Sequence, residues 1–260
     1  MHAWATEAAQ RSPWLHGYWQ YDFSDRYYSL AGVSVGATAA GVRVGSPGTP
    51  TDVSKLDARF YALNLLSELD SAGEYYIERS NQSQVARAHA GMLYFRRPDK
   101  PPAGQSHGDE KAFLSMAPSV ISITDGTSFV QFLGLRLEHS RGTAVRCNAT
   151  VQTSWGTKVC SVRNISISGC TVANTGGAGI ELHDCSGCVI EGSEIYGVAD
   201  LALSIAGGHH RTLTRSDNMI RDNSFHHYAR WTRTYQPGIF FAGVTHPSFF
   251  CKFATHSYHV

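Results

Sequence analysis

Residues able to do acid, base or binding chemistry recur at one position of a repeated sequence pattern. The pattern has four copies, and positions in each copy are counted from one reference residue, which we call its register point. The register points are Gly134, Gly169, Gly192 and Asp222. Five residues after them stand His139, Asn174, Gly197 and His227. Two histidines and an amide are therefore predicted to share one stripe. The charged and aromatic residues near the stripe include Arg141, Asp200, His226, Arg230, Trp231, Arg233 and Tyr235. Carboxylates supply general acid and base groups, arginine binds uronate or hydroxyl groups, and aromatic rings stack, which is the chemistry that a polysaccharide ligand requires.

The candidate catalytic residues are Asp200, His227 and Asp222. Asp200 is the preferred carboxylate because it stands on the loop before the apolar segment 201–203, and His227 is its acid/base partner. Asp222 takes the place that glycine holds at the other register points, so a turn role is favoured over catalysis there. His226 and His227 end a predicted strand, where we expect one ring to point outward and the other to pack.

The candidate substrate-binding residues are His139, Asn174, His210, Arg230, Trp231, Arg233 and Tyr235. His210 lies in Gly207-Gly-His-His-Arg211, whose glycines allow either a loop that approaches a ligand or a tight turn after Ile205. Aromatic residues also gather at 14–28, where packing is the first interpretation and a sugar-stacking platform is the second.

These residues must be positioned by the repeat itself, which has apolar residues at fixed offsets from its register points. Two residues before the points stand Phe132, Ile167, Ile190 and Ile220. Three residues after them stand Leu137, Val172, Ile195 and Phe225. Eleven residues after the first three come Val145, Ile180 and Leu203, and the fourth copy reaches Ile239 after a longer insertion. The spacing between points varies, as expected of short coils with loops of different length.

Apolar residues also alternate within each copy, as in Ile165-Ser-Ile167 and Ile180-Glu-Leu182, which is typical of a strand with one inward face. A single coil cannot bury that face, but stacked coils place equivalent residues in apolar ladders. The pattern therefore predicts an all-β solenoid. The alternative is an ordinary antiparallel β-domain with accidental spacing.

Three segments make the resemblance to a family specific: Asn164–Cys170, Cys188–Ile195 and Asn218–His227. They resemble coils of right-handed parallel β-helix proteins of the pectate-lyase-like superfamily. Within it, segments 16–22, 60–70, 73–76, 91–94 and 207–238 are similar to "right-handed β-helix region" proteins related to glycoside hydrolases. The resemblance implies an all-β fold, a right-handed parallel β-helix with an N-terminal β-rich appendage containing one short helix. It implies less about reaction, because the superfamily includes lyases, hydrolases, epimerases and non-catalytic binders.

The predicted organisation has three parts: the appendage at 1–112, the β-helix coils at 113–245, and an atypical C-terminal tail at 246–260. Phe60–Asp70 has helical apolar spacing and is predicted to be the short helix. Tyr75–Arg79 and Met92–Arg96 are predicted to form a hairpin. The coil pattern fails after Val244, so the sequence is interpreted as truncated or replaced at its C-terminus.

Composition restricts the partners. With 22 basic and 21 acidic residues, the net charge gives no electrostatic argument for nucleic acid or a membrane surface. No apolar run reaches the length of about 18 residues that a transmembrane helix needs, and the first residues lack a signal-peptide pattern. We expect a monomer whose partner is a polysaccharide or oligosaccharide. An extracellular location is suggested by the resemblance alone.

Cysteine spacing predicts neither a metal site nor a cofactor. Cys185-Ser-Gly-Cys188 has the spacing of half a zinc site, but no second pair follows, so buried thiols are the better interpretation. Cys147 and Cys160 flank an insertion that a disulfide would staple.

Two activities of the superfamily are disfavoured by missing motifs. The Asn-Thr-Asp, Asp-Asp and Gly-His-Gly set of polygalacturonases is not found, since Asn174-Thr-Gly176 departs at its third position. An acidic calcium cluster of the pectate-lyase type is not found either. The sequence therefore predicts a carbohydrate-active, glycoside hydrolase-like β-helix protein. The alternative is a non-catalytic glycan-binding or structural β-helix, possibly an incomplete fragment.

Overall fold

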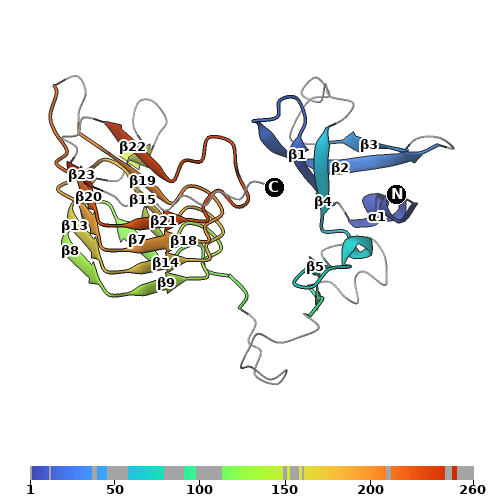
Figure 1. Ribbon diagram of the computed structural model, residues 1–260, viewed down its shortest axis with the longest axis horizontal. Coiled ribbons are helices and arrows are strands. Elements are labelled where there is room, and N and C mark those ends of the chain that lie inside the picture. The colour runs from blue at the N-terminus through green and yellow to red at the C-terminus, as the bar shows by residue number, and fades with distance from the viewer. Residues whose placement is uncertain are drawn as a thin grey trace. The chain divides into compact units, whose positions relative to one another are not determined.

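The computed structural model (Figure 1) describes residues 2–11, 13–36, 40–45, 58–78, 91–97, 113–148, 151–152, 158–159, 161–208, 212–243 and 248–250. The chain divides into two compact units, Met1–Lys111 and Ala112–Val260. We call them the N-terminal unit and the β-helix unit and describe each by itself.

The N-terminal unit is an antiparallel sheet of order β3-β2-β1-β4 that packs against helix α1. Its elements are α1 (His2–Arg11), β1 (Trp14–Tyr18), β2 (Asp25–Val35), β3 (Ala40–Val44) and β4 (Arg59–Leu63). Alternation along the strands turns Leu15, Tyr28 and Leu30 to the same side, where they pack against Trp4 and Ala8 of α1. One face of the sheet is therefore the core of this unit.

The short helix predicted for Phe60–Asp70 is wrong in position. Residues 59–63 form strand β4, which pairs with β1 in the register Leu15↔Ala62, and only Leu66–Glu68 form a short 3-10 helix, η2. Pairing with β1 overrides the helical spacing, because Phe60 and Ala62 alternate onto the core face. In the described part of the chain the α-helix is α1 instead, and its Glu7 carboxylate accepts hydrogen bonds from the N–H groups of Leu66 and Ser67 at 2.7 and 3.0 Å.

The predicted hairpin is confirmed. Strands β5 (Tyr75–Ile77) and β6 (Leu93–Phe95) pair antiparallel with Tyr76 opposite Tyr94.

The β-helix unit contains three parallel sheets that the chain visits in turn (Figure 1). The first sheet, of order β22-β19-β15-β10-β7, contains β7 (Ile121–Thr124), β10 (Val145–Asn148), β15 (Ile180–Leu182), β19 (Leu203–Gly207) and β22 (Ile239–Gly243). The second sheet contains β8 (Ser128–Leu133), β13 (Val162–Ser168), β16 (Cys185–Ser186), β17 (Val189–Glu191), β20 (Met219–Arg221) and β23 (Ser248–Phe250). The third sheet contains β9 (Arg136–Glu138), β14 (Thr171–Ala173), β18 (Glu194–Tyr196) and β21 (Ser224–His226). A small antiparallel pair, β11 (Val151–Gln152) and β12 (Lys158–Val159), lies in the insertion after β10.

The predicted apolar ladders are confirmed in register. In the second sheet, Ile167 pairs with Phe132 on one side and Ile190 on the other, and Ile190 pairs with Ile220. The third sheet aligns Leu137, Val172, Ile195 and Phe225. The first sheet aligns Val145, Ile180, Leu203 and Ile239. Most of these side chains are fully buried and belong to one core, in which each contributes about 2 kcal/mol of hydrophobic stabilisation.

The register points and the residues five positions later are the corners between sheets. Gly134, Gly169, Gly192 and Asp222 have φ of 63°, 59°, 57° and 55°. His139, Asn174, Gly197 and His227 have φ of 59°, 52°, 63° and 53°. This left-handed conformation is costly for most residues and is best tolerated by glycine, asparagine and aspartate. The predicted stripe is thus a row of corners, and the corner conformation of Asp222 agrees with a turn role.

Strand pairing continues beyond the end that the sequence pattern suggested. Ser248–Phe250 form β23, which pairs with β20 in the register Ile220↔Phe249 and thereby extends the second sheet. The prediction that no coil strand follows Val244 is therefore wrong for these three residues. A strand can pair through its backbone without repeating the earlier sequence.

Candidate functional site

The candidate site is a pair of carboxylates, Asp200 and Glu181, on the outer side of the β-helix unit. Asp200 lies on the loop between β18 and β19. Its N–H donates to the Gly177 carbonyl at 3.3 Å, and its own carbonyl accepts from the Ala229 N–H at 2.8 Å. These backbone bonds connect the Asp200 loop to the coil before it and to the insertion after β21.

The electrostatics of Asp200 are unusual for a surface aspartate. Burial raises the pKa of the Asp200 carboxyl above its ordinary value, and the nearby negative charge of Glu181 raises this pKa further. A hydrogen bond from the Thr232 side chain opposes both effects. Asp200 therefore keeps its proton to a higher pH than an exposed aspartate does.

Glu181 is held on the outer face of the first sheet. Ile180 and Leu182 are buried in the core, so alternation along β15 turns Glu181 outward. The Thr143 hydroxyl donates to its Oε2 atom at 2.9 Å. In register beside it lie Arg146 on β10 and Ser204 on β19. Sequence analysis did not select Glu181, although the alternation of Ile180-Glu-Leu182 had already placed it on an outer face.

The insertion between β21 and β22 packs against the Asp200 loop. The N–H groups of Trp231 and Thr232 donate to the Ala199 carbonyl at 3.0 and 3.2 Å, and the Gln236 side chain accepts from the Leu201 N–H at 3.2 Å. The insertion carries four of the predicted binding residues, which are Arg230, Trp231, Arg233 and Tyr235. All four are exposed, with Trp231 at 51% and Tyr235 at 85%. This segment therefore brings cationic and aromatic side chains to the margin of the Asp200 loop.

Arg230 connects this margin to the row of corners. Its guanidinium lies beside Gly197 and near the exposed Asn174. The position that a Cβ atom would take at Gly197 is 3.8 Å from Arg230 Nη1 and 2.9 Å from Asn174 Oδ1. Two predicted binding residues, Asn174 and Arg230, are thereby brought together.

His227 belongs to a different hydrogen-bonded group. Its Nδ1 atom is 2.6 Å from Nδ1 of His226, and His226 Nε2 is 3.2 Å from Glu194 Oε1. The His226 ring stacks on Tyr196 with 5.0 Å between ring centroids. Asp200 and His227 thus have different side-chain partners, although the Ala229 N–H ties their segments together. Farther along the corners, His139 stacks on Phe113 at 4.7 Å.

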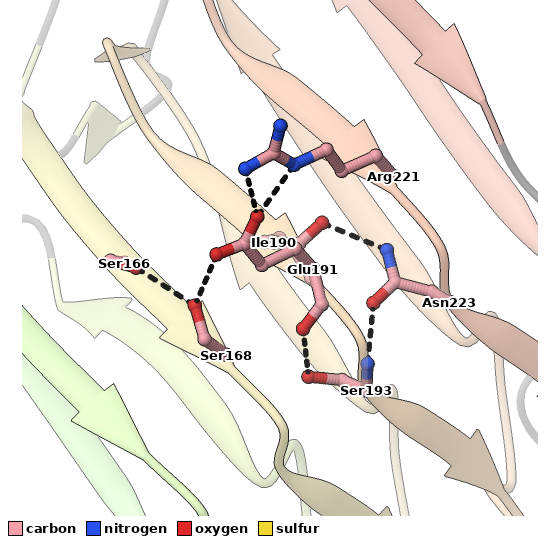
Figure 2. Close-up of polar contacts among 7 residues, drawn as sticks. All are labelled: Ser166, Ser168, Ile190, Glu191, Ser193, Arg221 and Asn223. Atoms are coloured by element: carbon pink, nitrogen blue, oxygen red, sulfur yellow. Dashed lines mark hydrogen bonds and ion pairs between the residues drawn. The ribbon is translucent and has the colours of Figure 1, made fainter.

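Asp222 borders a shallow depression of about 350 Å³ lined by Gly192, Ser193, Glu194, Asp222, Asn223 and Ser224. The buried side chain of Asn223 ties this corner to the preceding coil. Asn223 is buried, its Oδ1 atom accepts from the Ser193 N–H at 2.9 Å, and its Nδ2 atom donates to the Ile190 carbonyl at 2.8 Å (Figure 2).

The outer face of the second sheet carries a ladder of polar side chains that hydrogen-bond to one another (Figure 2). Arg221 binds the Glu191 carboxylate, which also accepts from the Ser168 hydroxyl at 3.1 Å. The hydrogen bond from Arg221 lowers the pKa of Glu191. This ladder is therefore a structural feature and a less promising site than the Asp200 loop.

Other sequence predictions fall outside these groups. His210 and Cys160 lie outside the residues that the structure describes. Cys147 is disulfide-bonded, whereas Cys170, Cys185 and Cys188 are free and buried. Among the residues described, no group of three or more His, Cys, Asp or Glu side chains is arranged to hold a metal ion. Within the same residues, no helix is long and apolar enough to cross a membrane.

The stacked parallel sheets, left-handed corners and apolar ladders define the unit as a parallel β-solenoid. Residues 123–249 match the family model described as "right handed beta helix region". This part of the chain is therefore a right-handed β-helix region. Searches of curated proteins and of solved structures gave no match.

Proposed function

We propose that the β-helix unit acts on a polysaccharide as a glycoside hydrolase-like enzyme, with Asp200 and Glu181 as its carboxylate pair. The observation that carries the proposal is the raised pKa of Asp200 next to a second carboxylate. Hydrolysis of a glycosidic bond needs one carboxyl group that keeps its proton and one that is ionised. Burial raises the pKa of the Asp200 carboxyl, which is the direction that a proton donor needs.

In this proposal Asp200 donates its proton to the leaving glycosidic oxygen as the bond to the anomeric carbon breaks. Glu181 takes the proton of the attacking water, or attacks the anomeric carbon itself before water releases the sugar. Arg230, Trp231, Arg233 and Tyr235 would position the chain of sugars by hydrogen bonding and stacking. His227 remains the alternative acid/base partner.

The test is incubation of the purified protein with a panel of plant and algal polysaccharides, reading new reducing ends and the absorbance of unsaturated products. New reducing ends without unsaturation are expected. They should disappear in the Asp200→Asn and Glu181→Gln variants. Asp184→Asn is the matched control, since Asp184 is exposed and its φ of 49° suits asparagine. Full turnover by Asp200→Asn would remove the assignment, and unsaturated products would indicate a lyase.

A second candidate is a non-catalytic glycan-binding β-helix. It is favoured by the hydroxyl partners that both carboxylates already have, Thr232 for Asp200 and Thr143 for Glu181. Such partners would hold the pair as a binding or structural group. Retention on a polysaccharide by folded protein without any product would support this function.

A further inference from the structure

We propose that the sheet face of the N-terminal unit opposite α1 is a separate glycan-binding platform, centred on the exposed ring of Tyr61. Alternation places Leu15 on the α1 side of β1, so Trp14, His16 and Tyr18 occupy the other side. In register with His16 stand Tyr27 on β2 and Tyr61 on β4. Three adjacent strands thus present an aromatic surface away from the helix.

A buried relay fixes the position of Tyr61. His16 Nε2 lies 2.8 Å from Asp25 Oδ2, and His16 Nδ1 lies 2.9 Å from the Tyr61 hydroxyl. A carboxylate accepts hydrogen bonds, so Nε2 donates to Asp25, and Nδ1 is left to pair with the Tyr61 hydroxyl. Both side chains of the His16–Asp25 pair are almost fully buried, with 4% and 1% of their surface exposed.

Holding Tyr61 through this relay requires two buried polar side chains. Burying a histidine and a carboxylate costs desolvation free energy, which their mutual hydrogen bond offsets. Tyr61 nevertheless keeps 51% of its surface exposed. The Tyr27 ring stacks on His16 at 4.1 Å and further limits movement of the imidazole. An exposed ring held in one orientation loses little conformational entropy when a ligand stacks on it.

The surroundings of Tyr61 suit a sugar ligand. Trp14, at 39% exposure, provides another open ring on the same face. Arg59 lies over the Tyr18 ring at 5.4 Å and contacts Asp22 at 3.5 Å, so donor and acceptor groups of opposite charge adjoin the rings. Tyr21 and Phe23, which flank Asp22, stack on each other at 5.4 Å and are exposed. Flat apolar faces beside neutralised polar groups suit the C–H faces and hydroxyls of a glycan.

The choice of ligand class rests on the proposed function of the β-helix unit, whereas the geometry of the platform does not. The experiment uses the full-length protein and four probes: soluble β-glucan, xylan, polygalacturonate and alginate. Affinity gel electrophoresis and titration should reveal binding to at least one of them. Tyr61→Ala should weaken it by about tenfold, the size expected for loss of a stacked aromatic contact. Tyr61→Phe, which keeps the ring but loses the bond to His16, should weaken it less.

The matched control is Tyr75→Ala, because Tyr75 is 60% exposed in the same unit but lies on the hairpin. Its affinity should equal that of the unmodified protein. Asp200→Asn should bind through the platform as before, which separates this site from turnover. Binding that Tyr61→Ala leaves intact would overturn the proposal, even if the enzyme is active. So would a failure of all four probes, or a dimer in sedimentation that Tyr61→Ala dissociates, because the occupant would then be a second copy.

Discussion

Asn223 bridges its own coil to the preceding one through Ser193, whose N–H donates to Asn223 Oδ1 at 2.9 Å. The Asn223 amide also donates to the Ile190 carbonyl, and its side chain is buried. One side chain therefore hydrogen-bonds two backbone groups of the preceding coil at the corner between the second and third sheets.

Asn223→Ala should lower the free energy of unfolding by about 1–3 kcal/mol for each buried group that it leaves unsatisfied. Urea denaturation followed by circular dichroism would measure this change. Gln131→Ala, at an exposed position of β8, is the control and should change stability by less than about 0.5 kcal/mol. Equal stability of the two variants would show that water replaces the Asn223 side chain.

The Ile190 ladder position should be among the most sensitive in the core. Ile190→Ala removes a fully buried side chain between Ile167 and Ile220 and should cost about 2–5 kcal/mol. Leu133→Ala, at a position that is 60% exposed, should cost much less. Comparison of their denaturation midpoints checks the prediction, and similar midpoints would contradict it.

The raised pKa of Asp200 predicts a pH dependence of stability. The folded protein holds this proton more tightly than the unfolded chain, so the group contributes stability below its ordinary pKa, and this contribution is lost as pH rises through the raised value. The Tm of the unmodified protein, relative to that of Asp200→Asn, should therefore fall from acidic toward neutral pH. Parallel Tm curves for the two proteins would show that Asp200 titrates as an exposed carboxylate.

The Glu191–Arg221 pair should behave in the opposite direction but weakly. Arg221 lowers the pKa of Glu191, so the contribution of the pair is present above the ordinary pKa of glutamate and is lost as pH falls through the lowered value. Because both side chains are partly exposed, Arg221→Ala should cost no more than about 1 kcal/mol, and less in high salt. Denaturation at two salt concentrations measures this, and a loss that salt does not change would argue for packing by the arginine stem.

The apolar ladders were predictable because every coil repeats the same inward positions, and one misplaced residue in a strand would reverse its faces. The helix was predicted in the wrong place because the spacing of Phe60 and Leu63 is a local signal. It contains no information about β1, which pairs with that segment. The local pattern of apolar residues therefore did not predict which strand pairs with this segment.

The candidate site was only partly predictable for a similar reason. Asp200 was selected from its loop, but the rise in its pKa depends on Glu181 from another coil and on burial beneath the insertion. The aromatic segment at 14–28 was recognised as a cluster, yet the hydroxyl that completes the His16 relay comes from Tyr61 on β4. Both groups depend on contacts between segments whose separation in sequence gives no repeating signal.

The order of strands in the first sheet has a consequence for how the unit loses structure. β15 lies in the middle of that sheet, with β10 and β7 on one side and β19 and β22 on the other. Since each coil contacts mainly its neighbours, local opening begins at the outer coils and moves inward. The backbone amides of β15 should then exchange with deuterium most slowly. The coils would unfold one after another from the outside inward.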